Sequence, residues 1–197
     1  MASRQPSDLE RLLAALTAEL GARQLPFMLI GGQAVLLHGS PRLTEDIDIT
    51  LGVEPDALPV LLKACTALGL TSLPVSVVEF VAETFVLPVR HEATRLRVDF
   101  IFSSTLYERQ AIARAHPVSI GGALVPFAAP EDLIIHKLFA GRPRDLEDVR
   151  GVVRRKGHAL DWRYVERWAR EFASVPGREG LPEAVLELRK LAGKAPK

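Results

Sequence analysis

The chain has 197 residues, 48% of them hydrophobic and 25% charged, with a formal net charge of +1 and one cysteine, Cys65. This composition suffices for one buried core with a small helical appendage, and the near balance of charge argues against a strongly basic nucleic-acid-binding surface. One cysteine excludes an internal disulfide and a cysteine-rich zinc site, and no apolar run reaches the ~20 residues of a membrane span. Because the first residues also lack the layout of a signal peptide, we expect a soluble cytoplasmic protein without membrane contacts.

The first third of the chain predicts alternating helices and strands. Ser7 and Glu10 form a capping box that begins a leucine-patterned helix, which ends near Gly21. Apolar runs, strict alternation and closing glycines then predict, in chain order, a strand, a short helix, a strand and a helix. These four elements span Phe27–Ile30, Gln33–His38, Asp46–Leu51 and Pro55–Leu68.

The middle of the chain has a less uniform pattern. The segment Thr71–Val81 is ambiguous and receives no assignment. Two strands joined by a turn follow, then a helix capped by Thr105 and Glu108, and then a hairpin that turns at Gly121-Gly122. The strands and the helix span Thr84–Val89, Leu96–Phe102, Thr105 to about Ala115, Val118–Ile120 and Ala123–Phe127.

After Ala129 the pattern is helical only. Prolines begin three of the expected helices, and glycines end two of them. These helices span Pro130–Ala140, Pro143–Lys156, Asp161–Ala173 and Pro182–Leu191. We therefore predict a core of strands and helices in residues 1–129 and a C-terminal helical region in residues 130–197 that packs on this core.

The segment from Phe27 to Leu51 carries the strongest chemical signal. A strand leads into Gly31-Gly32, a short helix follows, and the next strand begins with Asp46 and Asp48. Alternate residues of a strand share a face, so the two carboxylates project together and repel each other unless a cation lies between them. Oxygen ligands suit Mg²⁺, and a glycine turn suits a phosphate. The combination predicts metal-assisted chemistry on a nucleotide.

A third acid, Asp99, lies within the strand Leu96–Phe102. If this strand pairs with Asp46–Leu51, three carboxylates converge, and two divalent ions could bridge them and a triphosphate. The alternative is that Asp99 only pairs with Arg95 or Arg97 on an exposed face. We favour the metal-ligand interpretation because the glycine pair and the D-x-D strand are already present.

The glycine pair, the D-x-D strand and the later third acid together resemble the signature of the nucleotidyltransferase superfamily with the polymerase-beta-like fold. The stretch GGQA followed by HGSPRLTEDID is similar to the minimal and AbiEii-type nucleotidyltransferases of bacterial toxin–antitoxin systems. A second block, K-x4-R-x2-D-x2-D over residues 137–148, resembles a helix pair of that toxin family. The resemblance implies an α+β nucleotidyltransferase fold, with a mixed central sheet flanked by helices and a small C-terminal helical region.

The resemblance further implies transfer of a nucleoside monophosphate from an NTP to an acceptor hydroxyl, with release of pyrophosphate. Asp46 and Asp48 would hold Mg²⁺, as one ion or two, and Asp99 would complete the metal site and help activate the acceptor. Backbone N–H groups of Gly31 and Gly32 would contact the phosphates. Many members have serine at the second of these positions, so Gly32 lacks a hydroxyl contact.

Five further residues are candidates for nucleotide binding. Gln33 begins a helix whose dipole would favour a phosphate. Arg42 and Thr44 precede the acids in a loop, where Arg42 is either a phosphate clamp or a solvated charge. Lys137 either snorkels to solvent or reaches the nucleotide, and the resemblance favours the second. Asp145, like the acid three residues further along its helix, serves either the active site or a structural ion pair.

The leading hypothesis is an Mg²⁺-dependent nucleotidyltransferase toxin that modifies tRNA or a protein and has a cognate antitoxin. One alternative is a small-molecule nucleotidyltransferase, for example one that adenylylates an antibiotic hydroxyl. Another is a catalytically silent nucleotide-binding or partner-docking module, although the presence of all three acids argues against it. The balanced charge does not separate the acceptors, because a few local cations suffice to place an RNA end.

Overall fold

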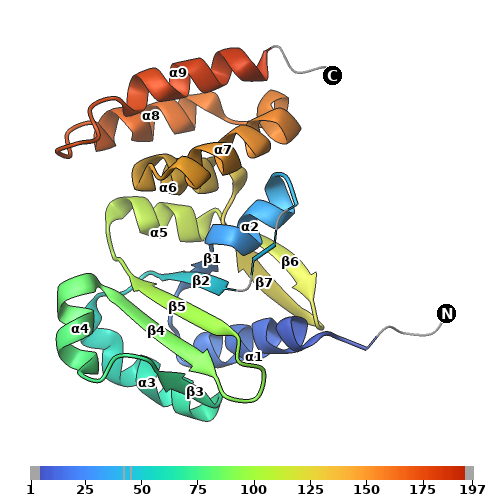
Figure 1. The fold of residues 1–197 in the computed structure, drawn as a ribbon, viewed down its shortest axis with the longest axis vertical. Helices are drawn as coiled ribbons and strands as arrows, with labels where there is room; N and C mark the ends of the chain where they lie inside the picture. Colours follow the sequence, from blue (N-terminus) through green and yellow to red (C-terminus); the bar gives the residue numbers. More distant parts are fainter. Residues whose placement is uncertain (1–4, 42, 45, 194–197) are drawn as a thin grey trace. The chain divides into compact units, whose positions relative to one another are not determined.

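The computed structural model describes residues 5–41, 43–44 and 46–193 (Figure 1). Its contacts divide the described residues into two compact units. The first unit contains the chain up to Ile30 and Thr44–Phe127, and the second contains Gly31–Leu43 and the chain from Ala128 on. The domain boundary expected near residue 129 stays a prediction, and the contacts group the segment Gly31–Leu43 with the C-terminal helices.

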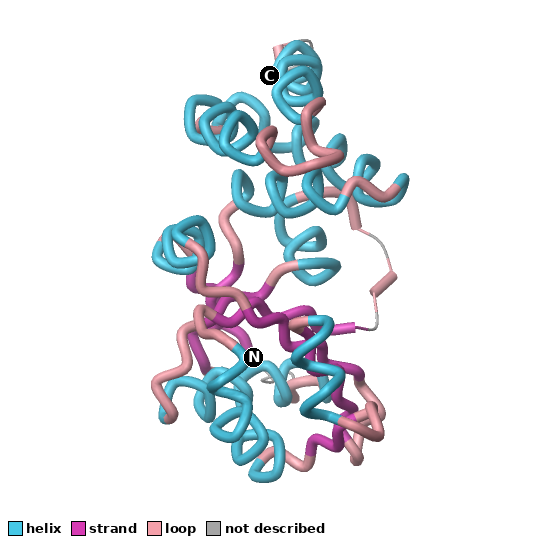
Figure 2. Tube along the Cα trace, turned by 90° about the vertical axis from the view of Figure 1, so that its left-hand side faces the viewer, coloured by secondary structure: helices cyan, strands magenta, loops and turns pink. Residues whose placement is uncertain are grey.

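Seven strands in the described part of the first unit form one mixed sheet, drawn in magenta in Figure 2. Their order is β3-β4-β5-β2-β1-β7-β6. The pairs β2–β5 and β1–β7 are parallel, and the other neighbours are antiparallel. The strands are β1 Phe27–Leu29, β2 Asp46–Leu51, β3 Leu70–Ser72, β4 Val86–His91, β5 Arg97–Phe102, β6 His116–Ile120 and β7 Ala123–Phe127.

The two central strands, β2 and β5, follow the alternation that their sequences predict. Ile47 and Ile49 of β2 are fully buried, as is Val98 of β5, whereas the acids between them lie on the other face. Burial of such side chains stabilises the sheet by about 1.5–3 kcal/mol each. Because successive residues of a strand point to opposite faces, the apolar residues are buried on one face and the carboxylates lie on the other.

Four α-helices, at α1 Asp8–Ala22, α3 Leu58–Ala67, α4 Val77–Thr84 and α5 Leu106–Ala113, belong to the described part of the first unit. The predicted capping box of α1 is confirmed, since the Ser7 N–H donates to Glu10 Oε2 at 2.6 Å and the Glu10 N–H donates to Ser7 Oγ at 3.2 Å. The predicted β6–β7 hairpin is also confirmed, with positive φ at Gly121 and Gly122. A Cβ on Gly121 would lie 2.8 Å from the Glu10 carbonyl oxygen, so the contact of α1 with this turn requires glycine.

Two local predictions differ from the structure, and one open segment is resolved by it. The strand expected from Thr84 begins at Val86, because Thr84 ends α4 and Phe85 adopts a left-handed φ of 57°. The ambiguous segment after Leu70 contains both the strand β3 and the start of α4. The short helix expected from Gln33 begins two residues earlier, as α2 Gly31–His38.

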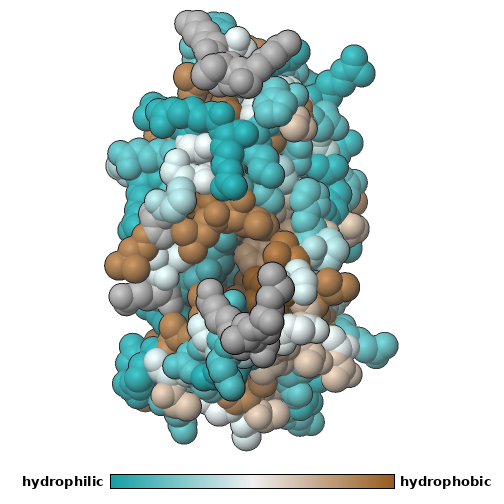
Figure 3. Space-filling view, turned by 90° about the vertical axis from the view of Figure 1, so that its right-hand side faces the viewer, coloured by the Kyte–Doolittle hydropathy of each residue, from teal (hydrophilic) through white to brown (hydrophobic). Residues whose placement is uncertain are grey.

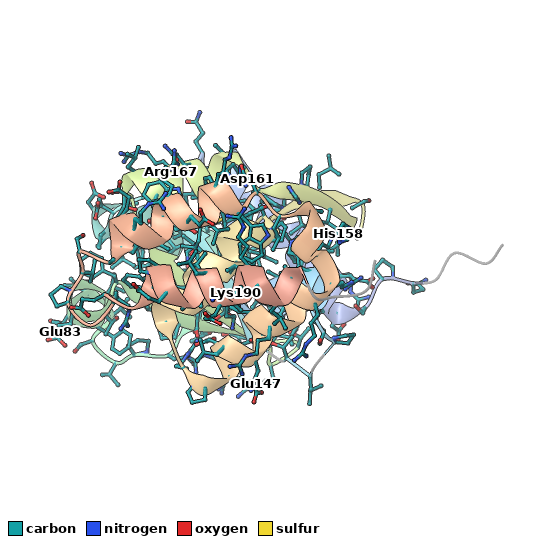
Figure 4. The ribbon with its side chains drawn as sticks, turned by 90° about the horizontal axis from the view of Figure 1, so that it is seen from above. Glu83, Glu147, His158, Asp161, Arg167 and Lys190 are labelled. Atoms are coloured by element: carbon teal, nitrogen blue, oxygen red, sulfur yellow. The ribbon has the colours of Figure 1, made fainter. Side chains whose placement is uncertain are left out.

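The second unit consists of helices and loops in its described residues (Figure 2). Besides α2, its α-helices are α6 Pro130–Ala140, α7 Pro143–Lys156, α8 Trp162–Phe172 and α9 Leu181–Ala192. The His38 ring at the end of α2 donates from Nε2 to the Ala128 carbonyl oxygen at 2.8 Å, which fixes α2 to the segment before α6. Asp161, labelled in Figure 4, caps α8 by accepting the Tyr164 N–H at 3.1 Å.

The face of the molecule drawn in Figure 3 is largely hydrophilic, as expected for a chain with 25% charged residues. Hydrophilic residues make up much of the face in Figure 3, with smaller apolar areas between them. Among the residues that the structure describes, no helix combines the length and the apolar character needed to cross a membrane.

Candidate active site

Three carboxylates share one face of the sheet where β2 and β5 run side by side. In the parallel register of these strands, Asp48 is the direct partner of Asp99 and Asp46 is the partner of Arg97. Neighbouring strands lie about 4.8 Å apart, and residues two apart on one strand point to the same side. Asp46 is exposed, and Asp48 and Asp99 are partly buried. The sheet therefore brings the three predicted acids together.

Arg97 stands among these carboxylates on the same face. Its Nε donates to Asp99 Oδ1 at 2.8 Å. This hydrogen bond, together with the negative charges of Asp99, Asp46 and Asp48, raises the pKa of Arg97 above its ordinary value. The guanidinium consequently stays charged and offsets part of the repulsion between the acids.

The engagement of Asp99 with Arg97 matters for metal binding. Within the described residues, no three His, Cys, Asp or Glu side chains are grouped so that they could hold a metal ion as they stand. The donors of the sheet site are of the right kind, because carboxylate oxygens are the ligands that Mg²⁺ prefers. For a divalent ion to be held by all three carboxylates, Asp99 would have to exchange Arg97 for the ion.

A second charged cluster is buried between α6 and α7 of the second unit. Lys137 Nζ lies 2.7 Å from Asp145 Oδ1 and 2.9 Å from Asp148 Oδ2, and all three side chains are less than 10% exposed. Arg142 is largely exposed and contacts Asp145 Oδ2 at 2.6 Å. Lys137 does not snorkel, so that alternative is wrong.

Opposing influences act on the pKa of Asp145. Burial, the largest single influence, favours the neutral acid and raises the pKa. Hydrogen bonds from Arg142 and Lys137, and their positive charges, together outweigh it and lower the pKa below its ordinary value. Asp145 is therefore ionised at neutral pH and is held by Lys137 and Arg142.

The remaining candidates lie at the start of α2 and before β2. Gly31 has a φ of 60°, a conformation in which other residues are strained, and begins α2. Gly32 and the Gln33 side chain are buried. Thr44 is partly buried, and Arg42 lies outside the described residues.

A family model described as "Nucleotidyl transferase AbiEii toxin, Type IV TA system" matches residues 11–192. The chain belongs to the AbiEii nucleotidyltransferase toxin family. A search of curated proteins found no match. The resemblance predicted from the glycine pair and the acids is confirmed, and so is the classification of this AbiEii chain as a nucleotidyltransferase enzyme.

Solved structures with similar folds are nucleotidyltransferases or resemble them. An antigenic nucleotidyltransferase-like protein from Paracoccidioides brasiliensis is 16% identical, with a TM-score of 0.54 and coverage of 90% of this chain and 93% of that one. The nucleotidyltransferase toxin MenT4 from Mycobacterium tuberculosis is 14% identical, with a TM-score of 0.52 and coverage of 94% and 83%. ANT(2")-Ia, solved with adenylyl-2"-tobramycin, is 18% identical, with a TM-score of 0.50 and coverage of 93% and 98%. These likenesses confirm the α+β nucleotidyltransferase fold.

The predicted site residues of the AbiEii chain form two groups. The three acids of the sheet belong to the first unit, and Lys137, Asp145 and the start of α2 belong to the second. The contact of Arg97 with Asp99 was foreseen only as the alternative to metal binding, although the R-V-D alternation places both side chains on one face. Asp148 was predicted to serve either a structural ion pair or the active site, and it lies 2.9 Å from Lys137 Nζ.

Proposed function

We propose that this AbiEii-family enzyme transfers a nucleoside monophosphate from an NTP to a hydroxyl of tRNA or protein and is the toxin of a pair with a cognate antitoxin. The observation that carries the proposal is the register of β2 and β5, which pairs Asp48 with Asp99 and leaves Asp46 on the same face. Three carboxylates at one place in a sheet repel one another, and such an arrangement persists where it binds cations.

In the proposed reaction, the acceptor oxygen forms a bond to the α-phosphorus of the NTP. The bond from that phosphorus to the oxygen bridging to the β-phosphate breaks, and pyrophosphate leaves with the electron pair. Asp99 orients the acceptor hydroxyl and takes its proton. Asp46, Asp48 and Asp99 would hold Mg²⁺, as one ion or two, and bound Mg²⁺ supplies positive charge to the phosphates.

Residues of the second unit are proposed to bind the nucleotide. Gly31 and Gly32 offer backbone N–H groups at the start of α2, and Gln33 follows them. Lys137, held by Asp145 in the buried cluster, has its charge fixed in one position. For these residues and for Arg42 and Thr44, the support is the family resemblance, and we assign each a role in holding the NTP.

Label transfer tests the reaction. The enzyme is incubated with each NTP, radiolabelled at the α-phosphate, in Mg²⁺ with total tRNA or total protein as the acceptor. We expect label from one NTP on one acceptor class and none with Asp46→Ala. Label that persists in Asp46→Ala, or a wild-type enzyme that labels neither acceptor, would refute the proposed reaction.

Arg97 provides a prediction that is independent of turnover. Because its guanidinium pairs with Asp99, it competes with a divalent ion for the same carboxylate. Exposed ion pairs contribute about 0.2–1 kcal/mol, so Arg97→Gln should bind Mn²⁺ more tightly without nucleotide, by a factor between about 1.4 and 5. Titration calorimetry measures this affinity, and Arg95→Gln removes the same charge two residues away. Equal affinities in both variants would show that Arg97 does not compete with the ion.

A further inference from the structure

An apolar pocket of about 470 Å³ opens in the first unit and reaches Arg97. Leu73, Val75 and Phe80 line one side of it, from the end of β3 to the middle of α4. Pro88 of β4 and Arg97 of the neighbouring strand β5 also line it. We call this cavity the Pro88 pocket. The proposed chemistry of the carboxylates does not use it.

Strand register connects the Pro88 pocket to the carboxylates. Pro88 is the direct antiparallel partner of Asp99, which is itself the direct partner of Asp48. The Leu73 N–H donates to the Pro88 carbonyl oxygen at 3.0 Å, so the row continues to the end of β3. Direct partners have side chains on the same face about 5 Å apart. A molecule in the pocket is therefore one strand away from Asp99.

Arg97 contributes to both places. It lines the Pro88 pocket and bonds to Asp99 Oδ1 at 2.8 Å. If the Arg97 side chain moves away from Asp99, both the lining of the pocket and the charge around the carboxylates change. This shared side chain gives the pocket a direct link to the reacting atoms that we propose.

The lining of the pocket includes exposed apolar side chains. Val75 is fully exposed at 104%, and Leu73 and Phe80 are also exposed. Val78 and Phe85, which lie in the same stretch of residues 73–85 but outside the lining, are 66% and 46% exposed. Contiguous exposed apolar surface of this kind marks binding sites in soluble proteins.

Acidic side chains accompany this apolar surface. Glu79 and Glu83 are four residues apart on α4, and both line the pocket (Glu83 is labelled in Figure 4). Like charges at this spacing repel on a helix. The acids of β2 and β5 lie nearby on the same face of the sheet, together with Arg97 and its direct partner Arg90. Glu79 and Glu83 make the α4 side of the pocket the part that attracts positive charge.

Strand order adds a feature suited to a polypeptide. In the described sheet, β3 is the outer strand on the side of the pocket. The outer edge of such a strand can pair with an extended segment through its backbone groups. An apolar pocket, an acidic rim and a strand edge together fit a basic and apolar peptide better than they fit RNA.

We propose that the Pro88 pocket is the acceptor site and that the acceptor is a protein segment with an apolar and a basic side chain next to its hydroxyl. The inference rests on the transfer reaction proposed above and names its acceptor. The apolar side chain enters the pocket, the basic side chain lies against Glu79 or Glu83, and the hydroxyl reaches Asp99. Its oxygen then bonds to the α-phosphorus, pyrophosphate leaves, and the proton passes to Asp99.

Peptide binding without NTP tests the pocket directly. The probe is a fluorescein-labelled peptide of alternating lysine and leucine around one central serine, and its control has glutamate in place of lysine. We expect fluorescence anisotropy to show binding of the lysine peptide to the wild type at least about tenfold tighter than of the glutamate peptide. Val75→Asp and Glu83→Arg should each weaken binding of the lysine peptide about tenfold.

Matched variants keep this test specific. Leu124→Asp places the same charge at an exposed apolar position of β7, and Glu147→Arg reverses an exposed charge on α7 (Figure 4). Both should bind the lysine peptide like the wild type. Equal binding of the two peptides, or unchanged binding in the pocket variants, would overturn the assignment of the pocket.

Transfer assays then separate this inference from the proposed reaction. We expect label on total protein, with kcat/KM lowered about tenfold in Val75→Asp and an unchanged Kd for the NTP. Label on tRNA alone would overturn the protein acceptor while leaving the reaction in place. If the wild type labels nothing, the proposed reaction fails, and the peptide titration still decides whether the pocket binds basic apolar segments.

Discussion

Asp48→Asn is expected to lower the rate of nucleotidyl transfer by roughly a thousandfold while leaving the fold intact. Asp48 is the acid at the centre of the group, two residues from Asp46 on β2 and paired with Asp99 on β5. Its amide would keep the size of the side chain and remove one negative charge that we propose to hold Mg²⁺. Because the acids repel one another, the free energy of unfolding should stay equal or rise slightly.

Two measurements on Asp48→Asn separate chemistry from folding. Initial rates of label transfer report the reaction, and urea unfolding reports the free energy of unfolding. Asp56→Asn makes the same change at an exposed acid of the first unit and should alter neither. Growth arrest on expression should disappear in Asp48→Asn and persist in Asp56→Asn. A marked loss of stability in Asp48→Asn would mean that the acid is structural.

The sequence predicted the strands of the sheet site better than their neighbours. Alternation of Ile47 and Ile49 with two acids is a local pattern, and the burial in β2 confirms it. The pairing of Asp48 with Asp99 joins strands about fifty residues apart, so no local pattern specifies their register. Only the family resemblance indicated that β2 and β5 are neighbours.

The segment that forms the pocket shows why other predictions failed. Val78 and Phe80 of α4 are exposed, so apolar residues there do not mark a core-facing stripe, and the period of the helix is obscured. Phe85 ends α4 in a left-handed conformation that glycine or asparagine would ordinarily signal. The expected strand therefore began at Thr84, two residues before β4 starts at Val86.

The sequence offered Asp145 and Asp148 as possible partners of Lys137 but did not decide between this pairing and the alternatives. The surrounding residues of α6 are apolar, which is compatible both with a lysine that extends to solvent and with one that is buried. The decision depends on Asp145 and Asp148 of the following helix, whose i, i+3 spacing was visible but whose orientation was not. The burial of Lys137 against two carboxylates depends on how α6 and α7 pack, which no local sequence pattern specifies.

Lys137→Met is accordingly expected to lower the free energy of unfolding by about 3–5 kcal/mol. The substitution retains a long side chain and removes the charge that lies 2.7 Å from Asp145 and 2.9 Å from Asp148. Two carboxylates then stay buried with less positive charge around them. By contrast, Lys190→Met breaks an exposed pair with Glu187 and should cost about 0–1 kcal/mol (Lys190 is labelled in Figure 4).

The pH dependence distinguishes lost charge from lost packing in Lys137→Met. In the wild type the pKa of Asp145 is lowered, so its ionised form stabilises the fold above the ordinary pKa of about 3.9, and this contribution is lost as the pH falls through the lowered value. In Lys137→Met, burial still raises the pKa of Asp145, but the positive charge of Lys137 no longer lowers it. The Asp145 carboxyl therefore accepts a proton more readily in the variant. The stability gap between the two proteins should therefore narrow below about pH 4.

Urea unfolding at neutral and acidic pH measures this gap, and Lys137→Met combined with Asp148→Asn provides a second check. Removing one buried charge together with its partner leaves fewer uncompensated charges, so the double variant should recover part of the lost stability. A gap that is the same at both pH values, with no recovery in the double variant, would mean that Lys137 stabilises the second unit by packing alone. The charge of the cluster would then matter for nucleotide binding rather than for folding, and NTP affinity in Lys137→Met would be the quantity to measure.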